Sequence, residues 1–405
     1  MRNTQQRVFI TGMGAVTALG CGVSPLWDAA VSGKSGVKPL ALPRIERQLI
    51  KTAAYVEDHN LETSGLAVNA ASVDRFSVLA LIAAREALHN AQWQTDAPLG
   101  ERTAVIIGSG IGGASTFDLE HYKFYVTKER GDTMAIPKVM PSAATSHVSM
   151  AHGATGPSFA VSSACSSSSQ AIGLGLVLLR SGLADRALVG GSECLLTPAS
   201  FRAWEGMRVL TPTLCRPFSA GRNGMVLGEG SAVLLLETEQ ALTERSARPL
   251  AELAGFGTNS DAGDLLRPDA QRCARAMALA LEDAGIAAAE VGYLNAHGTG
   301  TIINDRAETA ALQLVFGSNA DHLAVSSTKP VHGHALGAAG AIELVVTVGA
   351  LRHQIAPPTI NWTGPDPSCV PSPVPNVLLP HNFSVAMSNS FAFGGINACL
   401  VIRKA

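Results

Sequence analysis

The sequence predicts an α/β protein whose mostly parallel sheets are covered by helices on both faces. Short apolar runs of strand length alternate with longer helical patterns along the whole chain, and glycines separate them. Such apolar runs are typical of strands that are buried on both faces. With 405 residues, of which 47% are hydrophobic, the chain is long enough for two domains around one large core. Disordered and fibrous classes are thereby excluded.

The predicted elements follow from these patterns. A helix is predicted from Ser77 to Gln92, where apolar residues at helical spacing share one face, and another from Ala270 to Ala284, which ends at Gly285. Seven runs are predicted as strands: Arg7–Thr11, Thr103–Gly108, Ala187–Gly190, Ser231–Glu237, Val291–Ala296, Val385–Ser388 and Cys399–Ile402.

Charge and cysteine content narrow the class of protein. The 30 Lys and Arg against 32 Asp and Glu give a net charge of -2, which leaves no basic surplus for phosphates or anionic lipid. A nucleic-acid or membrane-surface partner is therefore not expected. The seven cysteines show no CxxC spacing and lie mostly in apolar segments, as in a reduced cytoplasmic protein. Neither a disulfide framework nor a zinc site is predicted.

The N-terminal segment is loosely similar to an export signal, because Arg2 and Arg7 precede an uncharged stretch. Gly12, Gly14 and Gly20 interrupt that stretch. We therefore interpret residues 7–14 as a first strand that runs into a glycine turn. No apolar run elsewhere approaches the roughly 18 residues needed to span a bilayer, so no membrane insertion is expected.

Two strand-turn-helix units suggest an internal duplication. Cys165 opens a small-residue turn into the apolar helix 170–183, and His334 opens a similar turn into the apolar helix 338–351. The charged stretch 239–250, which contains Pro249, is the expected seam. The predicted halves are residues 1–245 and 246–405, although the sequence pattern alone leaves the duplication open.

Cys165 is the strongest candidate for a reactive residue. It lies in a turn that leads from a strand into an apolar helix. Unpaired N–H groups at a helix N-terminus favour negative charge, so they can stabilise a thiolate and bind an oxyanion. The alternative, a structural buried cysteine, suits the other six better than it suits Cys165.

Two histidines and one lysine could act with this thiol. His297 follows the strand run 291–294, and His334 follows another short strand just after Lys329. Ligands gather at the carboxyl ends of parallel strands, and a cysteine nucleophile needs a proton acceptor or an electrostatic partner. A lone histidine is usually a structural residue, and spacing alone leaves both interpretations open.

Two glycine segments remain ambiguous. The segment 108–113 follows a strand and formally fits a dinucleotide-binding pattern, but residues 114–132 show no short βαβ unit that delivers an acidic residue. Its glycines could instead allow close approach to another chain or an acyl ligand. The segment 391–397 could aim backbone N–H groups and an aromatic ring at a site, or could contain a core aromatic pair.

Taken in order, these segments resemble the condensing enzymes of fatty-acid and polyketide synthesis, specifically the elongating β-ketoacyl-[acyl-carrier-protein] synthases I and II. The similarity covers nearly the whole chain. The segments that carry it are Val8–Thr17, Asp74–Phe76, Gly108–Gly113, Ser163–Ser166, Arg216–Phe218 with Gly228–Gly230, Asn295–Thr301, Lys329–Gly340 and Ser388–Asn397.

The resemblance implies a thiolase-like fold, with two βαβαβαββ halves in a five-layered αβαβα arrangement, usually as a homodimer. It implies that Cys165 accepts the acyl group and that His297 and His334 promote decarboxylation. Lys329 would fix the states of these histidines. The N–H groups of Cys165 and Phe393 would form the oxyanion hole, with the Phe393 ring as a gate.

The implied reaction is a decarboxylative Claisen condensation that extends an acyl chain by two carbons. Its partner would be an acyl carrier protein bearing acyl and malonyl groups on phosphopantetheine, and Thr299 and Thr301 would bind the pantetheine arm. No cofactor would be required. By the same resemblance a structural Na or K ion could be held by Asn295, Ala296, Glu343, Ser388 and Asn389.

Several positions depart from the family pattern. Ser219 and Asn223 replace common aspartates, Ile302 and Ile303 replace a proline-containing turn, Ala392 replaces a glycine, His332 replaces a threonine-like residue and Trp204 replaces phenylalanine. None of these removes a catalytic group. They leave room for a specialised lipid, polyene or polyketide substrate, with Ile111, Trp204 and Phe393 as candidates for setting chain length.

Three alternatives remain open. A non-catalytic chain-length-factor-like subunit of a heterodimer would share the fold, but such partners typically lose the cysteine. A thiolase would carry a second catalytic cysteine in the C-terminal turn, whereas Cys399 lies in the last predicted strand. A cysteine hydrolase would release a free acid, and the sequence offers it no obvious water-activating carboxylate.

Overall fold

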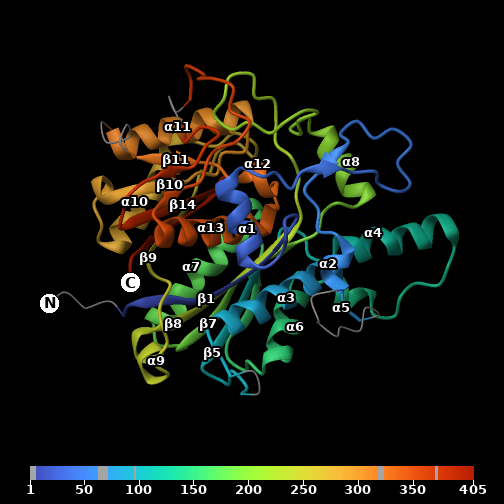
Figure 1. Ribbon diagram of the computed structural model, residues 1–405. Coiled ribbons are helices and arrows are strands. Elements are labelled where there is room, and N and C mark those ends of the chain that lie inside the picture. Colours follow the sequence, from blue (N-terminus) through green and yellow to red (C-terminus); the bar gives the residue numbers. More distant parts are fainter. Residues whose placement is uncertain (1–5, 63–71, 95–96, 318–322, 370–372) are drawn as a thin grey trace.

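A computed structural model describes residues 6–62, 72–94, 97–317, 323–369 and 373–405 (Figure 1). Its main feature is an 11-stranded mixed sheet, in which β2 pairs only with β1. The other strands follow the order β11-β10-β14-β15-β9-β1-β8-β7-β5-β6. Their bounds are β1 Val8–Thr17, β2 Gly20–Cys21, β5 Thr103–Gly108, β6 Ser158–Val161, β7 Arg186–Glu193, β8 Gly230–Thr238, β9 Ala251–Ser260, β10 Val291–Asn295, β11 Ala324–Ser326, β14 Val385–Ala392 and β15 Ile396–Arg403.

This sheet consists of two halves with the same topology. In each half the second strand lies between the third and the fourth and is parallel to both. The fifth strand then joins the fourth to the first through antiparallel pairing. The halves meet where β1 pairs with β9 over two residue pairs only, Phe9 with Glu252 and Ile10 with Ala251. The predicted duplicated α/β fold is confirmed. The expectation of mostly parallel sheets was wrong, because the first and fifth strands of each half pair antiparallel with their neighbours.

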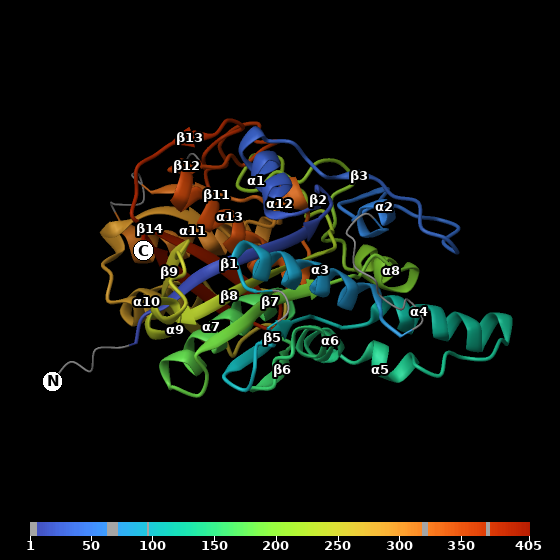
Figure 2. The same cartoon turned by 60° about the horizontal axis from the view of Figure 1, so that its bottom comes forward.

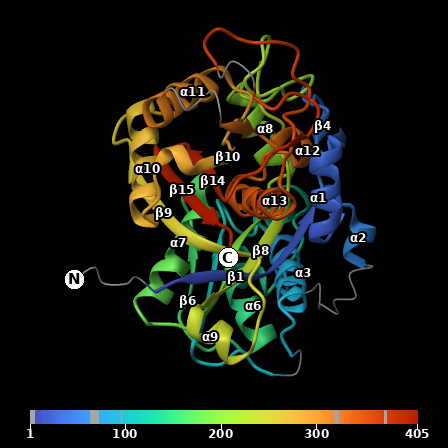
Figure 3. The ribbon, with the colours of Figure 1, turned by 60° about the vertical axis from the view of Figure 1, so that its left-hand side comes forward.

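Helices build five layers with these sheets. Helices α7 (Ser167–Arg180) and α13 (Ala339–His353) lie between the two half-sheets and contact strands of both. Helices α3 (Arg75–Asn90) and α6 (Ala143–His152) cover the outer face of the N-terminal half-sheet. Helix α10 (Ala270–Ala284) covers the opposite outer face, with α11 (Ile302–Phe316) beside it (Figure 3).

Shorter elements connect these layers. They are α1 Val23–Ser32, β3 Lys38–Pro39, β4 Thr52–Ala53, α2 Asp58–Glu62, α4 Ala114–Tyr122, η1 Lys123–Thr127, α5 Ala135–Val139, η2 Ala164–Ser166, α8 Pro198–Gly206, α9 Glu239–Glu244, η3 Ala288–Glu290, α12 Lys329–His332, η5 Leu336–Ala338, β12 Ile355–Ala356 and β13 Leu379–Pro380. Of these, α4 and α5 project away from the body of the molecule (Figure 2).

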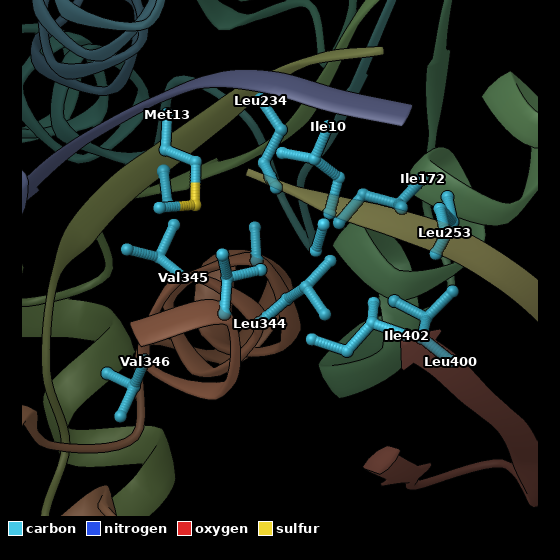
Figure 4. Close-up of a cluster of buried hydrophobic side chains, with 14 of the residues drawn as sticks. Ile10, Met13, Ile172, Leu234, Leu253, Leu344, Val345, Val346, Leu400 and Ile402 are labelled. Carbon is cyan, nitrogen blue, oxygen red and sulfur yellow. The ribbon is translucent and has the colours of Figure 1, made fainter. Parts of the chain in front are cut away.

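The central helix α13 corrects one expectation from the sequence. The segment Leu336–His353 is long and apolar enough to span a bilayer. The expectation that no apolar run beyond the N-terminal segment approaches this length was therefore wrong. The segment is 83% buried inside the protein, between the two half-sheets. Figure 4 shows Leu344 and Val345 packed among Met13 and Leu234 on one side and Leu400 on the other. A helix that is apolar on all sides is expected in such a core.

The first strand also differs from the prediction. No turn occurs at Gly12 and Gly14, because β1 continues to Thr17. A Cβ atom at Gly12 would lie 2.0 Å from the carbonyl oxygen of Ala87, and one at Gly14 would lie 2.0 Å from that of Ala83. These glycines therefore allow α3 to pack directly on the strand.

Strand β9, which was not among the predicted strands, also has glycines on which a helix packs directly. A Cβ atom at Gly255 would lie 2.3 Å from the Ala280 oxygen, and one at Gly257 would lie 2.2 Å from the Ala276 oxygen, both on α10. The first strand of each half is thus rich in glycine, which hides its strand pattern. Strand β14 was also underestimated: it continues beyond Ser388 to Ala392, and the turn begins at Phe393.

This packing predicts the effect of added volume on stability. Gly14→Ala should lower the free energy of unfolding by about 3 kcal/mol, because α3 must move to admit the methyl group. Gly206→Ala is the matched control: it is an exposed helical position where no described heavy atom lies within 4 Å of the new Cβ, and it should raise stability by about 0.5 kcal/mol. Thermal and urea unfolding check both values, and equal stabilities of the two variants would contradict the close-packing argument.

Candidate active site

The candidate site lies where the N-terminal ends of the two central helices meet. Cys165 lies in η2, directly before α7, and His334 lies directly before η5 and α13. His297 follows β10. All three side chains are buried. The Cys165 Sγ atom lies 3.1 Å from His334 Nε2, and the rings of His297 and His334 are 5.4 Å apart and nearly perpendicular. The fold thus brings together the three residues that the sequence singled out.

Lys329 completes this cluster. Its Nζ atom lies 2.5 Å from Glu343 Oε1 on α13 and 3.3 Å from His297 Nδ1, and its side chain is almost wholly buried. An ammonium group can only donate hydrogen bonds, so Nδ1 of His297 accepts. The neutral ring of His297 therefore carries its proton on Nε2.

Burial sets the protonation states of the two histidines. It lowers the pKa of His297 and that of His334 well below the usual histidine value, and the positive charge of Lys329 lowers both further. Both rings are consequently neutral at pH 7 and can offer N–H groups without carrying charge.

The same burial overturns the expected thiolate. It raises the pKa of the Cys165 thiol to about 12, although the charge of Lys329 and a hydrogen bond from the Phe393 N–H act in the opposite direction. Burial thus outweighs the charge of Lys329 and the Phe393 N–H in setting the pKa of this thiol. Cys165 rests as a neutral thiol beside a neutral histidine.

The Phe393 N–H is the clearest candidate for an oxyanion donor. It points at the Cys165 sulfur from the turn after β14, which is the position the sequence suggested. The Phe393 ring stacks on the indole of Trp204, with centroids 6.2 Å apart and planes 23° apart. Any movement of the Phe393 turn must therefore displace its ring from Trp204.

A cavity of about 510 Å³ opens onto the cluster. Cys165, His297 and His334 line its floor, and Thr299 and Thr301 line its wall with their hydroxyl oxygens 2.8 Å apart. Its other lining residues are Met207, Arg208, Val209, Asn223, Gly224, Met225, Asp264, Leu265, Leu266, Arg267, Pro268, Ile302, Ile303, Asn304, Phe391, Ala392, Phe393 and Gly395. Of the described residues suggested for substrate binding, Ile111 and Trp204 do not line this cavity.

Beneath the cluster lies a group of buried oxygen atoms. Asn295 Oδ1, Glu343 Oε2, Ser388 Oγ and Asn389 Oδ1 have no hydrogen-bond partner among the described residues. Asn295 and Ser388 are register partners on β10 and β14, and α13, which carries Glu343, packs on β14. Ala296 is the next buried residue after Asn295. Unpaired buried oxygens are costly, and they are the atoms that a monovalent cation would contact.

Metal-ligating atoms also converge in the cluster itself. The ligand atoms of Cys165, His297 and His334 lie within 4.8 Å of one another, an arrangement that could hold a metal ion on geometry alone. The ammonium group of Lys329 contacts His297, however, and a positive charge at this distance repels a cation. The ammonium group of Lys329 therefore disfavours a metal ion at these three residues.

Sequence patterns missed the acidic residues that hold the site. Glu308 on α11 accepts hydrogen bonds from the backbone N–H groups of His297 and Gly298, at 2.9 and 2.8 Å. Glu193, at the end of β7, accepts bonds from two further loops. Their only sequence signal is a charged residue at a position where the pattern predicts burial.

The residues that depart from the family pattern lie partly in the core and partly at the cavity. His332 is a satisfied core residue, since its Nε2 atom lies 3.0 Å from Thr328 Oγ1 and burial lowers its pKa to about 3. Ser219 bonds to Thr363, and Asn223 accepts from the Thr211 hydroxyl. Ile302 and Ile303 are about half exposed at the cavity mouth, where they change its surface rather than its floor.

Comparisons with known proteins agree with this geometry. The chain matches the family model "Beta-ketoacyl synthase, N-terminal domain" over residues 5–241 and "Beta-ketoacyl synthase, C-terminal domain" over residues 250–363. It is 39% identical over 403 residues to Nodulation protein E of Rhizobium sp. (strain N33), covering 98% of this chain and 99% of that protein. It is 38% identical over 408 residues to 3-oxoacyl-[acyl-carrier-protein] synthase 2 of Staphylococcus aureus (strain COL), covering 98% of each.

A solved structure gives the same result. The ishigamide ketosynthase/chain length factor superposes with a TM-score of 0.93 at 31% identity, covering 99% of this chain and all of the matched chain. The resemblance stated from the sequence, and the thiolase-like fold that it implied, are confirmed.

The neutral thiol generates a prediction. Alkylation of Cys165 by iodoacetamide should accelerate about tenfold per pH unit up to at least about pH 9, since only the thiolate reacts and its fraction keeps rising below the pKa. Intact-mass kinetics of the protein and of Cys165→Ala separate this thiol from the other six. A rate that is already constant between about pH 6 and 7 would reveal a preformed thiolate and contradict the stated balance of burial and charge.

Proposed function

The chain belongs to the β-ketoacyl synthase family, and from this premise we propose that Cys165 carries the acyl group while His297 and His334 stabilise the charge formed during condensation. The protein is a 3-oxoacyl-[acyl-carrier-protein] synthase, a condensing acyltransferase. The roles of its residues are the proposal. The observation that carries them is the 3.1 Å approach of Cys165 Sγ to His334 Nε2 at the floor of a cavity that also holds His297.

The first step transfers the acyl group to the enzyme. The Cys165 sulfur attacks the thioester carbonyl of the acyl carrier, and His334 takes the thiol proton and passes it to the departing pantetheine thiol. The new S–C bond replaces the old one, so no other reactant is required. The carbonyl oxygen becomes negative in the transition state, and we assign the N–H groups of Cys165 and Phe393 as its donors, since the Phe393 N–H already donates to the Cys165 sulfur.

The second step forms the carbon–carbon bond. Once acylated, Cys165 no longer donates to His334, so the proton of that neutral ring can lie on Nε2. The malonyl thioester loses carbon dioxide, and the electron pair of the broken bond becomes an enolate whose oxygen accepts N–H bonds from Nε2 of His297 and Nε2 of His334. The enolate carbon then attacks the acyl carbonyl on Cys165. The thiolate of Cys165 leaves and takes up a proton from solvent, and a chain longer by two carbons departs on the carrier.

Lys329 supports both histidines in this scheme. Its donation to His297 Nδ1 keeps the proton of that ring on Nε2, and its charge disfavours imidazolium. Glu343 compensates the buried ammonium group. Every group used comes from the chain and the substrates, which is consistent with the expectation that no cofactor is required.

An acyl carrier protein is the proposed partner, docked at the mouth of the cavity. A thioester that reaches Cys165 must pass Thr299 and Thr301, whose hydroxyl groups suit the amide groups of pantetheine. Arg208 and Arg267 line the same cavity and supply positive charge for an acidic carrier. Ile111 and Trp204 lie outside this cavity, so a role in substrate binding would require the acyl chain to extend beyond Phe393.

We further propose that the protein functions as a homodimer. The projecting segment from α4 to α5 and the edge strand β6 expose large apolar side chains, which are Phe117, Leu119, Phe124, Tyr125, Val126, Ile136 and Phe159. Such a surface is typical of an interface. A synthase-like partner in place of a second copy is the alternative, in line with the ketosynthase/chain length factor structure.

Three smaller proposals accompany this function. The two halves are assigned to residues 1–245 and 246–405, which is supported by the change of sheet after β8 and by the break between the matched family models at 241 and 250. A cytoplasmic location is supported by seven free thiols. A specialised acyl substrate remains a prediction, because the nodulation and Staphylococcus relatives are equally similar.

The buried oxygens beneath the site are assigned to a Na or K ion. Asn295, Glu343, Ser388 and Asn389 would offer side-chain oxygens, and Ala296 would offer its backbone carbonyl. Oxygen ligands suit such a hard cation. The ion would contact Glu343 Oε2, the carboxylate oxygen that does not bond to Lys329, and it would take no part in the reaction steps.

Acylation of Cys165 tests the main proposal. A panel of acyl carrier proteins with different chain lengths should add an acyl mass to the protein but not to Cys165→Ala, and malonyl carrier protein should then yield a β-ketoacyl product. His297→Ala should still be acylated, while its decarboxylation rate should fall about 10²- to 10³-fold, since one N–H donor to the enolate is lost. His353→Ala, an exposed histidine, is the matched control and should behave as the unaltered protein.

Two outcomes would contradict the roles assigned. An absence of acylation with malonyl carrier protein left intact would indicate a non-catalytic partner subunit. Release of free acid from an acylated Cys165 would indicate a hydrolase.

The ion generates a separate prediction. Replacing choline with potassium or sodium at constant ionic strength should stabilise the protein by about 1–3 kcal/mol, because a ligand that binds only the folded state raises stability. Ser388→Ala should reduce this effect. Ser77→Ala removes another buried, unpartnered hydroxyl outside the cluster and should leave the effect intact. Equal melting temperatures of the unaltered protein in all three salts would rule out the ion.

A further inference from the structure

The Glu193 carboxylate joins two loops at one buried point. Glu193 ends β7 and is fully buried. Its Oε2 atom accepts hydrogen bonds from the N–H of Gly110 at 2.5 Å and from the N–H of Gly337 at 3.0 Å. Its Oε1 atom accepts from the Ser109 hydroxyl at 3.1 Å and from the Ile111 N–H at 3.4 Å. One side chain thus holds the loop after β5 against the turn of η5.

The first of these loops contacts the segment that leads into Cys165, and the second follows His334 directly. Ser109 N donates to the carbonyl of Val161, and Ser162 Oγ donates to the carbonyl of Gly110, so the first loop is bonded to the strand end that leads into Cys165. Gly337 lies three residues after His334 in the turn that opens α13. The Gly110–Glu193–Gly337 contact therefore spans the two segments whose spacing sets the distance from thiol to imidazole.

The backbone at this junction has no free space. A Cβ atom at Gly337 would lie 2.4 Å from the Gly110 nitrogen and 2.5 Å from Glu193 Oε2. A Cβ atom at Gly191 would lie 2.7 Å from the Gly337 oxygen and 2.6 Å from Ser168 Cβ. Because the loops touch through bare backbone, a shift of one is transmitted to the other.

The fold itself does not require a carboxylate here. In the N-terminal half Gly108 pairs with Gly191, and in the C-terminal half Asn295 pairs with Ser388 at the corresponding strand ends. Two residues further on, these strands carry Glu193 and Ser390. The second half thus closes the same junction with a neutral hydroxyl that contacts Ser169. The four donors to Glu193 are uncharged, and burial without a cation is costly for a carboxylate, whose pKa is raised to about 7.

From this geometry, and resting on the proposed roles of Cys165 and His334, we propose that Glu193 is a positioning residue for the condensation. Its Oε2 atom holds the Gly110 and Gly337 N–H groups together and so keeps His334 within hydrogen-bond distance of the nucleophile. It touches neither substrate nor reacting atoms.

Two variants separate this role from bulk stability. Glu193→Ala removes both acceptors and should lower the Cys165 acylation rate at saturating acyl carrier protein about 10²-fold, because a misplacement near 1 Å has an effect of this size. The half-saturating concentration should change less than about threefold, since Thr299 and Thr301 are untouched. Glu193→Gln keeps one oxygen for Gly110 and Gly337 and can direct its amide to Ser109, so it should recover the rate to within about threefold.

Glu86→Ala is the matched control. Glu86 on α3 also accepts two backbone N–H groups, those of Ala15 on β1 and Val23 at the start of α1, both at 2.8 Å, and it does not line the cavity that contains Cys165. It should lower the melting temperature and leave the acylation rate per folded molecule unchanged. Rates are therefore normalised to the folded fraction measured by circular dichroism.

The outcomes are distinguishable from failure of the proposed function. The proposal is overturned if Glu193→Ala acylates at the rate of the unaltered protein, if Glu86→Ala loses the same factor, or if Glu193→Gln fails to recover the rate. If the unaltered protein itself takes up no acyl group, the result contradicts the proposed function and not the role of Glu193.

Discussion

The packing of α7 against α13 between the two half-sheets is the constraint on which the site depends. Both helices are buried, and the contact near their N-termini is too tight for a side chain at Gly340, where a Cβ atom would lie 2.0 Å from Ser169 Oγ. The Ala341 N–H donates to the Ser168 hydroxyl across this contact. Because helix starts carry unpaired N–H groups, the approach of two of them creates a region of the core that favours negative charge. The proposed reaction forms such charge on oxygen in acyl transfer, in decarboxylation and in condensation.

A second constraint follows from placing a cation in that region. Lys329 is fully buried, and a buried ammonium group requires a compensating charge and hydrogen bonds. Glu343 supplies the charge and His297 Nδ1 accepts a hydrogen bond, so the same ion pair that satisfies the core also selects the tautomer of His297. The same burial disfavours the reactive thiolate form of Cys165 in the resting site. Burial keeps the Cys165 thiol protonated, and activation therefore waits for a carbonyl group that uses the donors already in place.

Much of this could be predicted from the sequence. Small-residue turns before apolar helices identified Cys165 and His334, and a strand end identified His297, because these signals are local in the chain. What could not be predicted depends on contacts between distant segments. Gly12 and Gly14 were interpreted as a turn. They are glycines because α3 packs directly on them, and the contacting residues Ala83 and Ala87 are distant in the sequence. Glu193 and Glu308 are single acids with no motif around them. Burial raises the pKa of Cys165, and burial is a property of the whole core that no local pattern shows. The stacking of Trp204 on Phe393 likewise joins residues that no local pattern connects.

The two halves contribute different groups to the proposed reaction. The proposed nucleophile comes from the N-terminal half, and both histidines, Lys329 and the Phe393 N–H come from the C-terminal half. The halves share strand order, yet their equivalent strand ends differ, with Glu193 in one place and Ser390 in the other. A symmetric pair of helix starts would offer two equal anion sites. A buried lysine, two histidines and an acid make the two starts unequal, so that in the proposed mechanism one holds a covalent acyl group while the other presents donors to the enolate that attacks it. The separation of these tasks across a rigid core fixes the distance between the reacting carbons without a mobile catalytic domain.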